Sequence, residues 1–454
     1  MPNAKTGTYL TELKLSNIKS FKDDHVLSLR DSEDRLARWT LILGDNGVGK
    51  TTLLQCIAHM APFRNTNDPD GAKDPTFFIE PTGASEVSNI EALARHGAQN
   101  VRLEATFVAA GVLDESQRNR RSRQFTNFVE FERKSGKIER FEASQTEDVI
   151  KKEPLIIAYG AGRKLGRGNI DPVSATAGMA SLFDDQVELV DAEELIQQLD
   201  YAALRRGSKI SSRQNRVMKE MIAALLPDVE TAENIILYGP SPLTPRQKVG
   251  VVVRTPYGEV PLSELSFGYQ TMTAWLADIG YRLFRHYPES ANPLLQPAIV
   301  LVDEIDLHLH PRWQRQLRER LAAHFPAVQF IATAHSPLMA QAYMSENLAV
   351  VRREGDHAVI VNEPDAVKGW RLDQVITSEL FGLTSAYSPE VEALFETQRL
   401  LRTKRQRTPA ETLRLAEVEQ QLMDLPQESD PADDRALAII RRAAARLERD
   451  GADT

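Results

Sequence analysis

The chain has 454 residues and a formal net charge of −9; 42% of its residues are hydrophobic and 26% are charged. These values are ordinary for a globular protein, and the length allows two or three domains or one large domain with insertions. They exclude a chain that is basic throughout, as many nucleic-acid binders are, and the single cysteine excludes both a disulfide framework and a cysteine metal site.

The N-terminal segment, residues 1–12, is polar and lacks the apolar core of a secretory signal. No stretch approaches about 18 uninterrupted apolar residues, so we predict no membrane span. A reducing, cytoplasmic location fits the single cysteine. Residues 8–30 then alternate apolar and polar side chains twice, which predicts two strands.

Residues 41–52, LILGDNGVGKTT, predict an apolar strand, a glycine-rich turn and a helix that opens at Lys50. They match the phosphate-binding pattern G-x-x-x-x-G-K-[ST] at every fixed position. Successive N–H groups of such a turn point at one anion, and the helix N-terminus adds its dipole. We expect Lys50 to meet the β- and γ-phosphates of ATP and Thr51 to hold Mg²⁺. The expected nucleotide-binding residues are Gly44, Asp45, Asn46, Gly47, Val48, Gly49, Lys50, Thr51 and Thr52.

The middle of the chain predicts a loop rich in proline, then short strands, then helices. The expected elements are a loop at 62–85, a helix near 87–95, a strand at 101–108, a hairpin at 128–141, a buried strand at 155–159 and helices within 189–226.

A second α/β half is expected from Val249 onward, and the remainder from Asp373 is expected to be helical, with a good helix start at 408–411. The expected elements are strands at 249–254, 298–302 and 329–333, helices at about 269–284 and 312–325, and a hairpin of strands at 348–352 and 358–361.

Residues 298–304, AIVLVDE, predict a strand buried on both faces that ends in two carboxylates. The carboxyl ends of such strands are where open α/β sheets bind ligands. We expect Asp303 to orient Mg²⁺ through its water shell and Glu304 to polarise the water that attacks the γ-phosphate. Considered without the phosphate loop, this motif has an alternative interpretation: a strand that ends in a polar turn with no catalytic role.

Two further motifs belong to the same set. Residues 265–270, LSFGYQ, precede an expected helix that Ser266 can cap, and Gly268 lets the backbone approach an anion. His335 follows the strand at 329–333 and stands where a γ-phosphate could be sensed. Five elements thus occur in a fixed order: phosphate loop, Leu-Ser-x-Gly, Asp-Glu, Asp306 and His335.

This order resembles that of ABC-class ATPases, over residues 8–64 and 247–362. The resemblance implies that 265–270 is the signature motif, which completes the ATP site of a second subunit in a head-to-head homodimer. It also implies that Asp306 lies in the D-loop and that His335 is the switch histidine. One departure is that the loop at 158–163 has no glutamine for a Q-loop, and Arg163 there is either phosphate-facing, lobe-facing or a surface arginine.

Residues 304–311, EIDLHLHP, resemble the RecF/OLD branch of that class. His308 and His310, two residues apart, could be metal ligands on one face of a strand, but no cysteine or further clustered histidine supports that, and the D-loop interpretation is preferred. Only about 215 residues separate Lys50 from Ser266, too few for the long coiled-coil arm of an SMC protein.

The tail resembles ATPases of bacterial anti-phage systems, through residues 372–383 and the helices expected up to 425. The Septu ATPase (PtuA) and its retron-associated relatives are the most similar, and the PARIS ATPase (AriA) shares the general plan. Segments 157–163 and 181–184 agree with that group. The resemblance implies a separately encoded effector, an HNH nuclease in Septu or a TOPRIM nuclease in PARIS; the chain shows no nuclease motif of its own.

Three clusters of basic residues interrupt the acidic chain, at 118–123, 205–219 and 399–407. Each could contact the phosphates of DNA or RNA, form a solvated face, or bind an acidic partner. Aromatic residues do not interleave them, so stacking on single strands is not supported.

We therefore expect an α/β fold: an ABC-type P-loop ATPase head with a mixed sheet and antiparallel N-terminal strands, a helical insertion and a helical C-terminal tail. The expected segments are 1–165 and 247–365 for the two halves of the head, 166–246 for the insertion lobe, and 366–454 for the tail that docks a partner. Catalysis is expected from Glu304 and His335, and magnesium binding from Thr51 and Asp303.

The expected function is that of a dimeric ATPase that senses infection and regulates an effector nuclease in anti-phage defence. The alternative is a RecF-like repair ATPase that acts on DNA without a dedicated nuclease. A transporter ATPase subunit is a third possibility, which the missing Q-loop glutamine and the long helical tail argue against.

Overall fold

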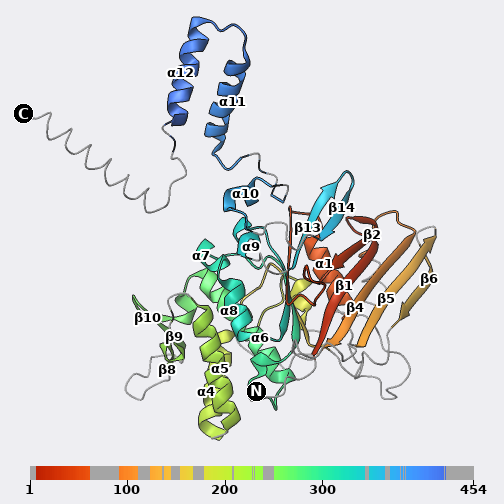
Figure 1. Cartoon of the computed structure of the whole chain (residues 1–454). Coiled ribbons are helices and arrows are strands. Elements are labelled where there is room, and N and C mark those ends of the chain that lie inside the picture. Colours follow the sequence, from red (N-terminus) through yellow and green to blue (C-terminus); the bar gives the residue numbers. More distant parts are fainter. Residues whose placement is uncertain are drawn as a thin grey trace, which may run out of the picture. The chain divides into compact units, whose positions relative to one another are not determined.

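The structure of the protein is a computed structural model, and its parts are shown in Figure 1. It describes residues 7–61, 92–110, 123–134, 137–144, 154–166, 178–206, 209–226, 229, 231–238, 250–342, 347–362, 369–378, 380–381, 383, 385–423 and 425. The chain divides into two compact units, Met1–Gly382 and Leu383–Thr454.

A large mixed sheet forms the centre of the first unit. Its strands are β1 (Gly7–Ile18), β2 (Phe21–Ser28), β3 (Trp39–Gly44), β4 (Asn100–Ala110), β5 (Arg123–Lys134), β6 (Lys137–Ser144), β7 (Ile156–Tyr159), β11 (Ala298–Val302), β12 (Val328–Thr333), β13 (Asn347–Glu354) and β14 (His357–Asn362). Within the described residues their spatial order is β6-β5-β4-β1-β2-β14-β13-β3-β12-β11-β7.

One side of the sheet is parallel, from β13 through β3, β12 and β11 to β7. The residues of β11 and β12 are buried throughout, as are nearly all of β3, which explains their continuous apolar sequences. Because these strands run in the same direction, their carboxyl ends meet at one edge. The phosphate loop, Asp303 and the segment after Thr333 all follow those ends.

The other side of the sheet is antiparallel: β1 pairs with β2 and β4, and β4, β5 and β6 form a meander. The strands expected at 8–30 and 101–108 and the hairpin at 128–141 are confirmed, and so is the mixed sheet with antiparallel N-terminal strands.

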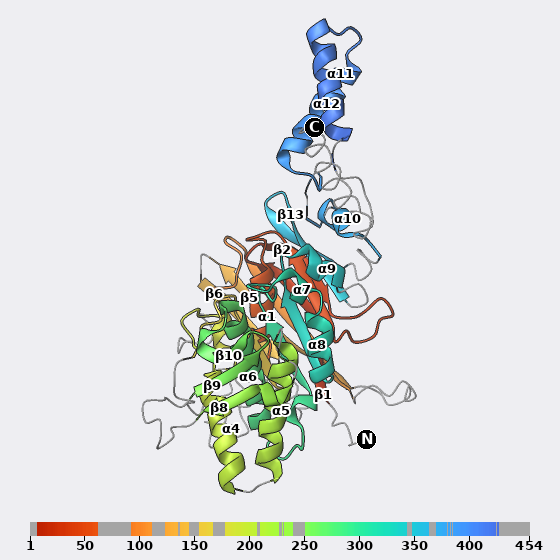
Figure 2. The same ribbon diagram turned by 90° about the vertical axis from the view of Figure 1, so that its left-hand side faces the viewer.

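Helices cover both faces of the sheet (Figures 1 and 2). They are α1 (Lys50–His59), α4 (Ala192–Arg206), α5 (Lys209–Leu225), α6 (Phe267–His286), α7 (Pro311–Gln314), α8 (Leu317–His324), α9 (Pro337–Ala342) and α10 (Leu372–Ile376). Alternate residues of β3 enter opposite cores: Leu41 and Leu43 pack with α4, α5, α6 and α8, whereas Ile42 packs on the side of α1.

The strand expected at 249–254 is confirmed, but it lies outside the central sheet. It is β9 (Gly250–Thr255), the middle strand of a separate antiparallel sheet with β8 (Ile235–Tyr238) and β10 (Gly258–Pro261). Its burial alternates, with Val251 and Val253 inward, as in a sheet that is buried on one face. The central strands are buried on both faces instead.

Three expected helical regions also differ. Residues 92–95 of the helix expected near 87–95 form a turn and a bridge from Ala94 to Ile18, and 87–91 lie outside the described residues, as does the loop at 62–85. The helix expected at 312–325 is two helices, α7 and α8. The tail is not continuously helical, because α10 ends at Ile376 and residues 385–388 form no helix.

The second unit contains α11 (Pro389–Thr403) and α12 (Pro409–Met423), which pack against each other. The helix start expected at 408–411 is confirmed by a reciprocal cap: the Glu411 N–H donates to Thr408 Oγ1 (3.3 Å), and the Thr408 N–H donates to Glu411 Oε2 (2.9 Å). Within the described residues, no helix has both the length and the apolar character that a membrane crossing requires.

His59, on α1, gives the fold a pH dependence. The residue is 3% exposed, its ring packs edge-on against Phe183, and burial lowers its pKa to about 4. An unfolded chain would therefore bind a proton below about pH 6.5 that the folded chain rejects. We expect the free energy of unfolding to fall by roughly 3 kcal/mol between about pH 7 and pH 4 through this residue alone.

Chemical denaturation at each pH tests this. The His59→Asn variant should lose that part of the pH dependence, whereas His96→Asn, at an exposed histidine, should keep it. Equal pH profiles for wild type and His59→Asn would contradict the assignment.

Candidate functional site

The phosphate loop, residues 44–51, joins the end of β3 to α1. Gly44 has φ 148° and Gly49 φ 110°, in the region that residues with a Cβ avoid. A Cβ on Gly44 would lie 2.1 Å from the Val351 carbonyl oxygen of β13, so the loop passes directly against that strand. The N–H groups of the first turn of α1 have no partner within the helix, so they add hydrogen-bond donors for an anion beside the loop.

Lys50 is the first residue of α1 and is 6% exposed. Its ammonium donates to the carbonyl oxygens of Gly44 (2.8 Å) and Asp45 (2.7 Å). Burial lowers its pKa, and the nearby carboxylate of Asp303 opposes that shift. A partly desolvated cation held at the mouth of a glycine loop suits the binding of a phosphate.

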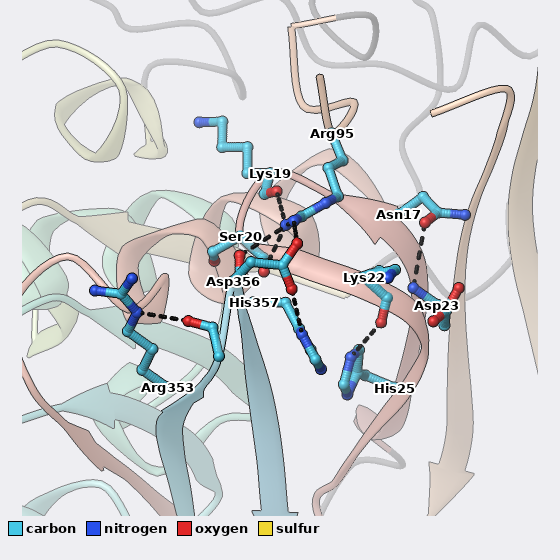
Figure 3. Close-up of polar contacts among 11 residues, drawn as sticks. Asn17, Lys19, Ser20, Lys22, Asp23, His25, Arg95, Arg353, Asp356 and His357 are labelled. Atoms are coloured by element: carbon cyan, nitrogen blue, oxygen red, sulfur yellow. Dashed lines mark hydrogen bonds and ion pairs between the residues drawn. The ribbon is translucent and has the colours of Figure 1, made fainter. Parts of the chain in front are cut away.

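The turn between β1 and β2 packs against the phosphate loop at Val48 and Gly49. The Ser20 hydroxyl donates to the Val48 carbonyl (2.9 Å), and Gly49 lies so close that a Cβ there would be 2.4 Å from Ser20 Oγ. Figure 3 shows how Arg95 fixes this turn: its guanidinium donates to the Lys19 and Ser20 carbonyls (3.2 and 3.1 Å) and bonds Asp356 on the β13–β14 turn. Sequence reasoning did not find Arg95, because it lies where a helix was expected.

Asp303 lies at the end of β11 and receives two short hydrogen bonds. The Thr51 hydroxyl donates to its Oδ2 (2.7 Å), and the Thr333 hydroxyl donates to its Oδ1 (2.6 Å). The carboxylate is 5% exposed. A buried carboxylate beside a threonine hydroxyl is the pair of oxygen donors that Mg²⁺ prefers, so the two residues expected to hold magnesium are brought together.

Glu304 has an unusual backbone, with φ 48°, a conformation that costs a non-glycine residue roughly 1–3 kcal/mol. Its N–H donates to Thr333 Oγ1 (2.7 Å), and its carbonyl accepts from Arg163 Nη2 (2.8 Å). On the next residue, the Ile305 N–H donates to the Thr333 carbonyl (2.9 Å). The backbone of the expected catalytic glutamate is therefore held from two sides.

His335 lies beside Glu304, with 3.9 Å between its Nε2 and Glu304 Oε1. Asp306 holds the histidine backbone, because its Oδ2 accepts from the N–H groups of His335 (3.1 Å) and Ser336 (2.8 Å). The Ser336 hydroxyl donates in turn to Gln314 Oε1 of α7 (2.6 Å). Asp306 and His335, which we expected in the D-loop and switch, thus form one connected unit.

The signature loop, residues 265–270, runs into α6. Ser266 stands at the N-cap position, but its side chain makes no capping hydrogen bond, which corrects that part of the sequence interpretation. The Gln270 side chain holds the preceding turn by donating to the Ser263 and Leu265 carbonyls (2.8 and 2.7 Å). The Ser266 side chain remains exposed.

The signature loop packs against the D-loop, residues 305–310, of the same chain. A Cβ on Gly268 would lie 2.5 Å from the His308 carbonyl oxygen, and the rings of Phe267 and His308 meet edge to face at 4.8 Å. A cavity of about 670 Å³ opens between them, with Ser266 and Gly268 on one wall and Trp313 on the other. Phe267 is 56% exposed at its rim.

The metal interpretation of His308 and His310 gains no support. Neither lies on a strand: His308 is in a turn, and His310 caps α7 by accepting from the Arg312 N–H (3.3 Å). Within the described residues, no group of three metal-ligating side chains comes together.

The basic clusters are partly accounted for. The first, at 118–123, lies outside the described side chains. In the second, Arg216 pairs with Glu220 and Lys219 with Asp200. In the third, at 399–407, Arg402 and Lys404 pair with glutamates of α12. These pairs leave less free charge for a nucleic acid than the sequence suggested.

The expected site therefore assembles in two parts. Lys50, Thr51, Asp303, Glu304 and His335 meet at the carboxyl edge of the parallel strands, whereas the contacts of Ser266 and Gly268 described above are with the D-loop. Sequence reasoning missed Thr333, whose only signal is a polar residue ending a buried strand, and it left open the place of Arg163, which is buried.

Comparison with known proteins now adds to this geometry. A family model described as "AAA domain, putative AbiEii toxin, Type IV TA system" matches residues 40–340. The Septu protein PtuA of Bacillus mycoides (strain KBAB4) is 26% identical over 396 residues, covering 87% of this chain and 47% of that protein. The probable ATPase of retron Vc95 of Vibrio cholerae serotype O1 biovar El Tor is 35% identical over 139 residues, covering 31% of this chain and 25% of that protein.

The chain spans less than half the length of each of these two relatives. Among solved structures, the SMC head domain from Thermotoga maritima has a TM-score of 0.40 at 15% identity and covers 78% of this chain and 98% of that one. The expected resemblance to Septu and retron-associated ATPases is confirmed, as is the expectation of an ATPase domain.

Thr333→Val tests the site directly. The substitution keeps the shape of the side chain but removes the donor to Asp303 and the acceptor for the Glu304 N–H. We expect the magnesium-dependent rate of ATP hydrolysis to fall by about 10- to 100-fold, as when other residues that orient metal ligands are removed.

The matched control is Thr273→Val, on α6, where the hydroxyl donates only to the Tyr269 carbonyl of its own helix (2.8 Å). Steady-state hydrolysis should separate the two variants. Equal rates for Thr333→Val and Thr273→Val would show that Thr333 plays no part in the site.

Proposed function

Because the chain belongs to the family of AAA domains whose model matches residues 40–340, we propose that it binds and hydrolyses ATP as a dimer and regulates a separately encoded effector nuclease in anti-phage defence. The single observation that carries the ATPase part is the cluster of Thr51, Asp303, Glu304 and His335 at the end of the parallel strands. A cytoplasmic location belongs to the same proposal.

The residues of the site divide the work. The phosphate loop and Lys50 bind the β- and γ-phosphates of ATP. Thr51 and Asp303 hold magnesium, which when bound neutralises charge that develops on the phosphate oxygens. The fit of these residues to Mg²⁺ rests on their two oxygens, which lie 2.7 Å apart; Asp303 is almost buried, whereas Thr51 is exposed.

Glu304 accepts a proton from, or polarises, the attacking water, and the neighbouring His335 orients the water and the γ-phosphate. Thr333 and Arg163 keep the Glu304 backbone in its left-handed conformation. Asp306 keeps the His335 backbone in place through two hydrogen bonds.

The signature loop supports a site shared between two copies of the chain. Ser266 is exposed and makes no capping bond, and the half-buried Gly268 stands beside it at the start of α6, so this loop is suited to meet the phosphates of an ATP held by a second copy of the chain. Phe267, 56% exposed, offers apolar contact area at the same surface. A head-to-head dimer that encloses two ATP molecules uses these features.

Features of the second unit, residues 383–454, support the proposal of a protein partner. Tyr387, Phe395, Leu400 and Leu413 of this unit are exposed and apolar, and no residue of α11 is buried. Exposed apolar residues on a helical hairpin are typical of a docking surface. An HNH or TOPRIM nuclease is the class of effector that the resemblance to defence ATPases implies.

Lys50→Ala tests ATP binding. Hydrogen bonds to charged groups contribute roughly 1.5–3 kcal/mol each, and the variant loses one bond to each of two phosphates, so we expect the affinity for ATP to fall by at least about 100-fold. Titration with a fluorescent ATP analogue measures the change, and a variant that binds ATP as wild type does would contradict the role of the loop.

Glu304→Gln separates binding from hydrolysis. A general base contributes about 10²- to 10⁴-fold, so we expect hydrolysis to fall by that factor while ATP binding is kept. With ATP retained, light scattering should report twice the mass of one chain. If both this variant at saturating ATP and the wild-type protein are monomeric, the dimer is excluded.

A further inference from the structure

Arg163 lies in the loop that follows β7, where the sequence lacks the expected glutamine. The residue is 4% exposed, although arginines are mostly found at the surface. Burial lowers its pKa to about 10, and the carboxylates of Asp303, Asp306 and Glu304 oppose that shift. The guanidinium is therefore still a cation at neutral pH, enclosed near the three acidic residues of the site.

A purely structural role accounts poorly for this arginine. Only its Nη2 is bonded, to the Glu304 carbonyl (2.8 Å); among the described residues its buried Nε and Nη1 have no hydrogen-bond partner. Burying a cation with unused donors destabilises a fold, and such groups in native proteins call for an explanation in function. The bond that is made falls on the residue expected to drive hydrolysis.

The bond falls where Glu304 needs support. A left-handed backbone such as that of Glu304, with φ 48°, persists only where the surrounding structure holds it. Thr333 holds the N–H and Arg163 holds the carbonyl. Because the side-chain direction follows the backbone, loss of one hold moves the carboxylate of Glu304 relative to His335 and to the attacking water.

The loop that carries Arg163 is also fixed to the segment that leads into the helical lobe, α4 and α5. The Leu189 N–H donates to the Lys164 carbonyl (2.9 Å). A Cβ on Gly160 would lie 2.2 Å from the Ser181 carbonyl oxygen, and one on Gly166 would lie 2.0 Å from the Leu189 carbonyl oxygen, so two further points are in close contact. Asp191 then caps α4 through the Glu193 N–H (2.9 Å).

We propose that Arg163 is a positioning residue for ATP hydrolysis: it holds the Glu304 backbone in its catalytic conformation and ties that conformation to the helical lobe. The inference rests on the proposed ATPase function. It assigns Arg163 a role that acts through Glu304, so its removal should lower kcat and leave the affinity for ATP unchanged.

The test compares Arg163→Gln and Arg163→Lys with Arg38→Gln. Arg38 also donates to a backbone carbonyl, that of Ala327 (2.9 Å), but it precedes β3 at the opposite edge of the sheet. We expect Arg163→Gln to lower kcat by about 10- to 100-fold with little change in KM, because small displacements of a catalytic group have effects of that size. Arg163→Lys should recover part of the loss, since its ammonium can still donate to one carbonyl.

A double variant isolates the route. In a Glu304→Gln background, Arg163→Gln should cause no further loss of hydrolysis, whereas an independent effect would multiply. Two readouts do not depend on turnover: the affinity of a fluorescent ATP analogue should match that of wild type, and the melting temperature shows whether the variants fold.

The outcomes are distinct. A folded Arg163→Gln protein with wild-type kcat, or one whose loss equals that of Arg38→Gln, overturns the positioning role while the ATPase function stands. Multiplied losses in the double variant overturn the route through Glu304. A wild type that hydrolyses no ATP overturns the proposed function, and the positioning role with it.

Discussion

The carboxylate of Asp303 is the interaction on which the site depends, because it joins residues that lie far apart in the chain. Thr51, in the N-terminal half, donates to one oxygen (2.7 Å), and Thr333, in the C-terminal half, donates to the other (2.6 Å). These bonds fix the phosphate loop, β11 and β12 at one edge of the sheet. The parallel strands are buried on both faces, so the edge cannot shift without disturbing two cores.

A second buried carboxylate connects this edge to the signature helix. Asp278 of α6 accepts from the Tyr159 hydroxyl (2.6 Å), the Val190 N–H (3.2 Å) and Arg282, and the Tyr159 carbonyl accepts from the Asp303 N–H (2.8 Å). Every oxygen of the carboxylate is used, which is what makes a fully buried charge tolerable. Tyr159 connects α6 to Asp303, and Arg163 connects the helical lobe to Glu304. A shift of α6 or of the lobe would therefore move these two acidic residues.

Sequence reasoning succeeded where chemistry or burial restricts the residue type. The glycines, Lys50 and Thr51 of the phosphate loop recur at fixed spacing, and the apolar sequences of β3, β11 and β12 follow from burial on both faces. It failed where a partner distant in the sequence decides. Nothing in the local sequence indicates that Thr333 donates a hydrogen bond to Asp303. Arg163 is a residue of a type that is usually exposed. The strand β9 pairs with β8 and β10 because only one of its faces is buried. Ser266 was recognised as an N-cap, but the structure leaves its side chain unused for that purpose.

In the dimer that we propose, each ATP site takes its phosphate loop from one copy of the chain and its signature loop from another. Lys50→Ala should inactivate the first element and Ser266→Glu, by repelling phosphate at an exposed position, the second. Hydrolysis by an equal mixture of the two variants is the most direct test, since a mixed dimer has one site with both defects and one with none. We expect recovery to roughly a quarter of wild-type activity, because half of the dimers are mixed and half of their sites are intact. Two inactive variants that stay inactive when mixed, although light scattering shows that they exchange subunits, would contradict it.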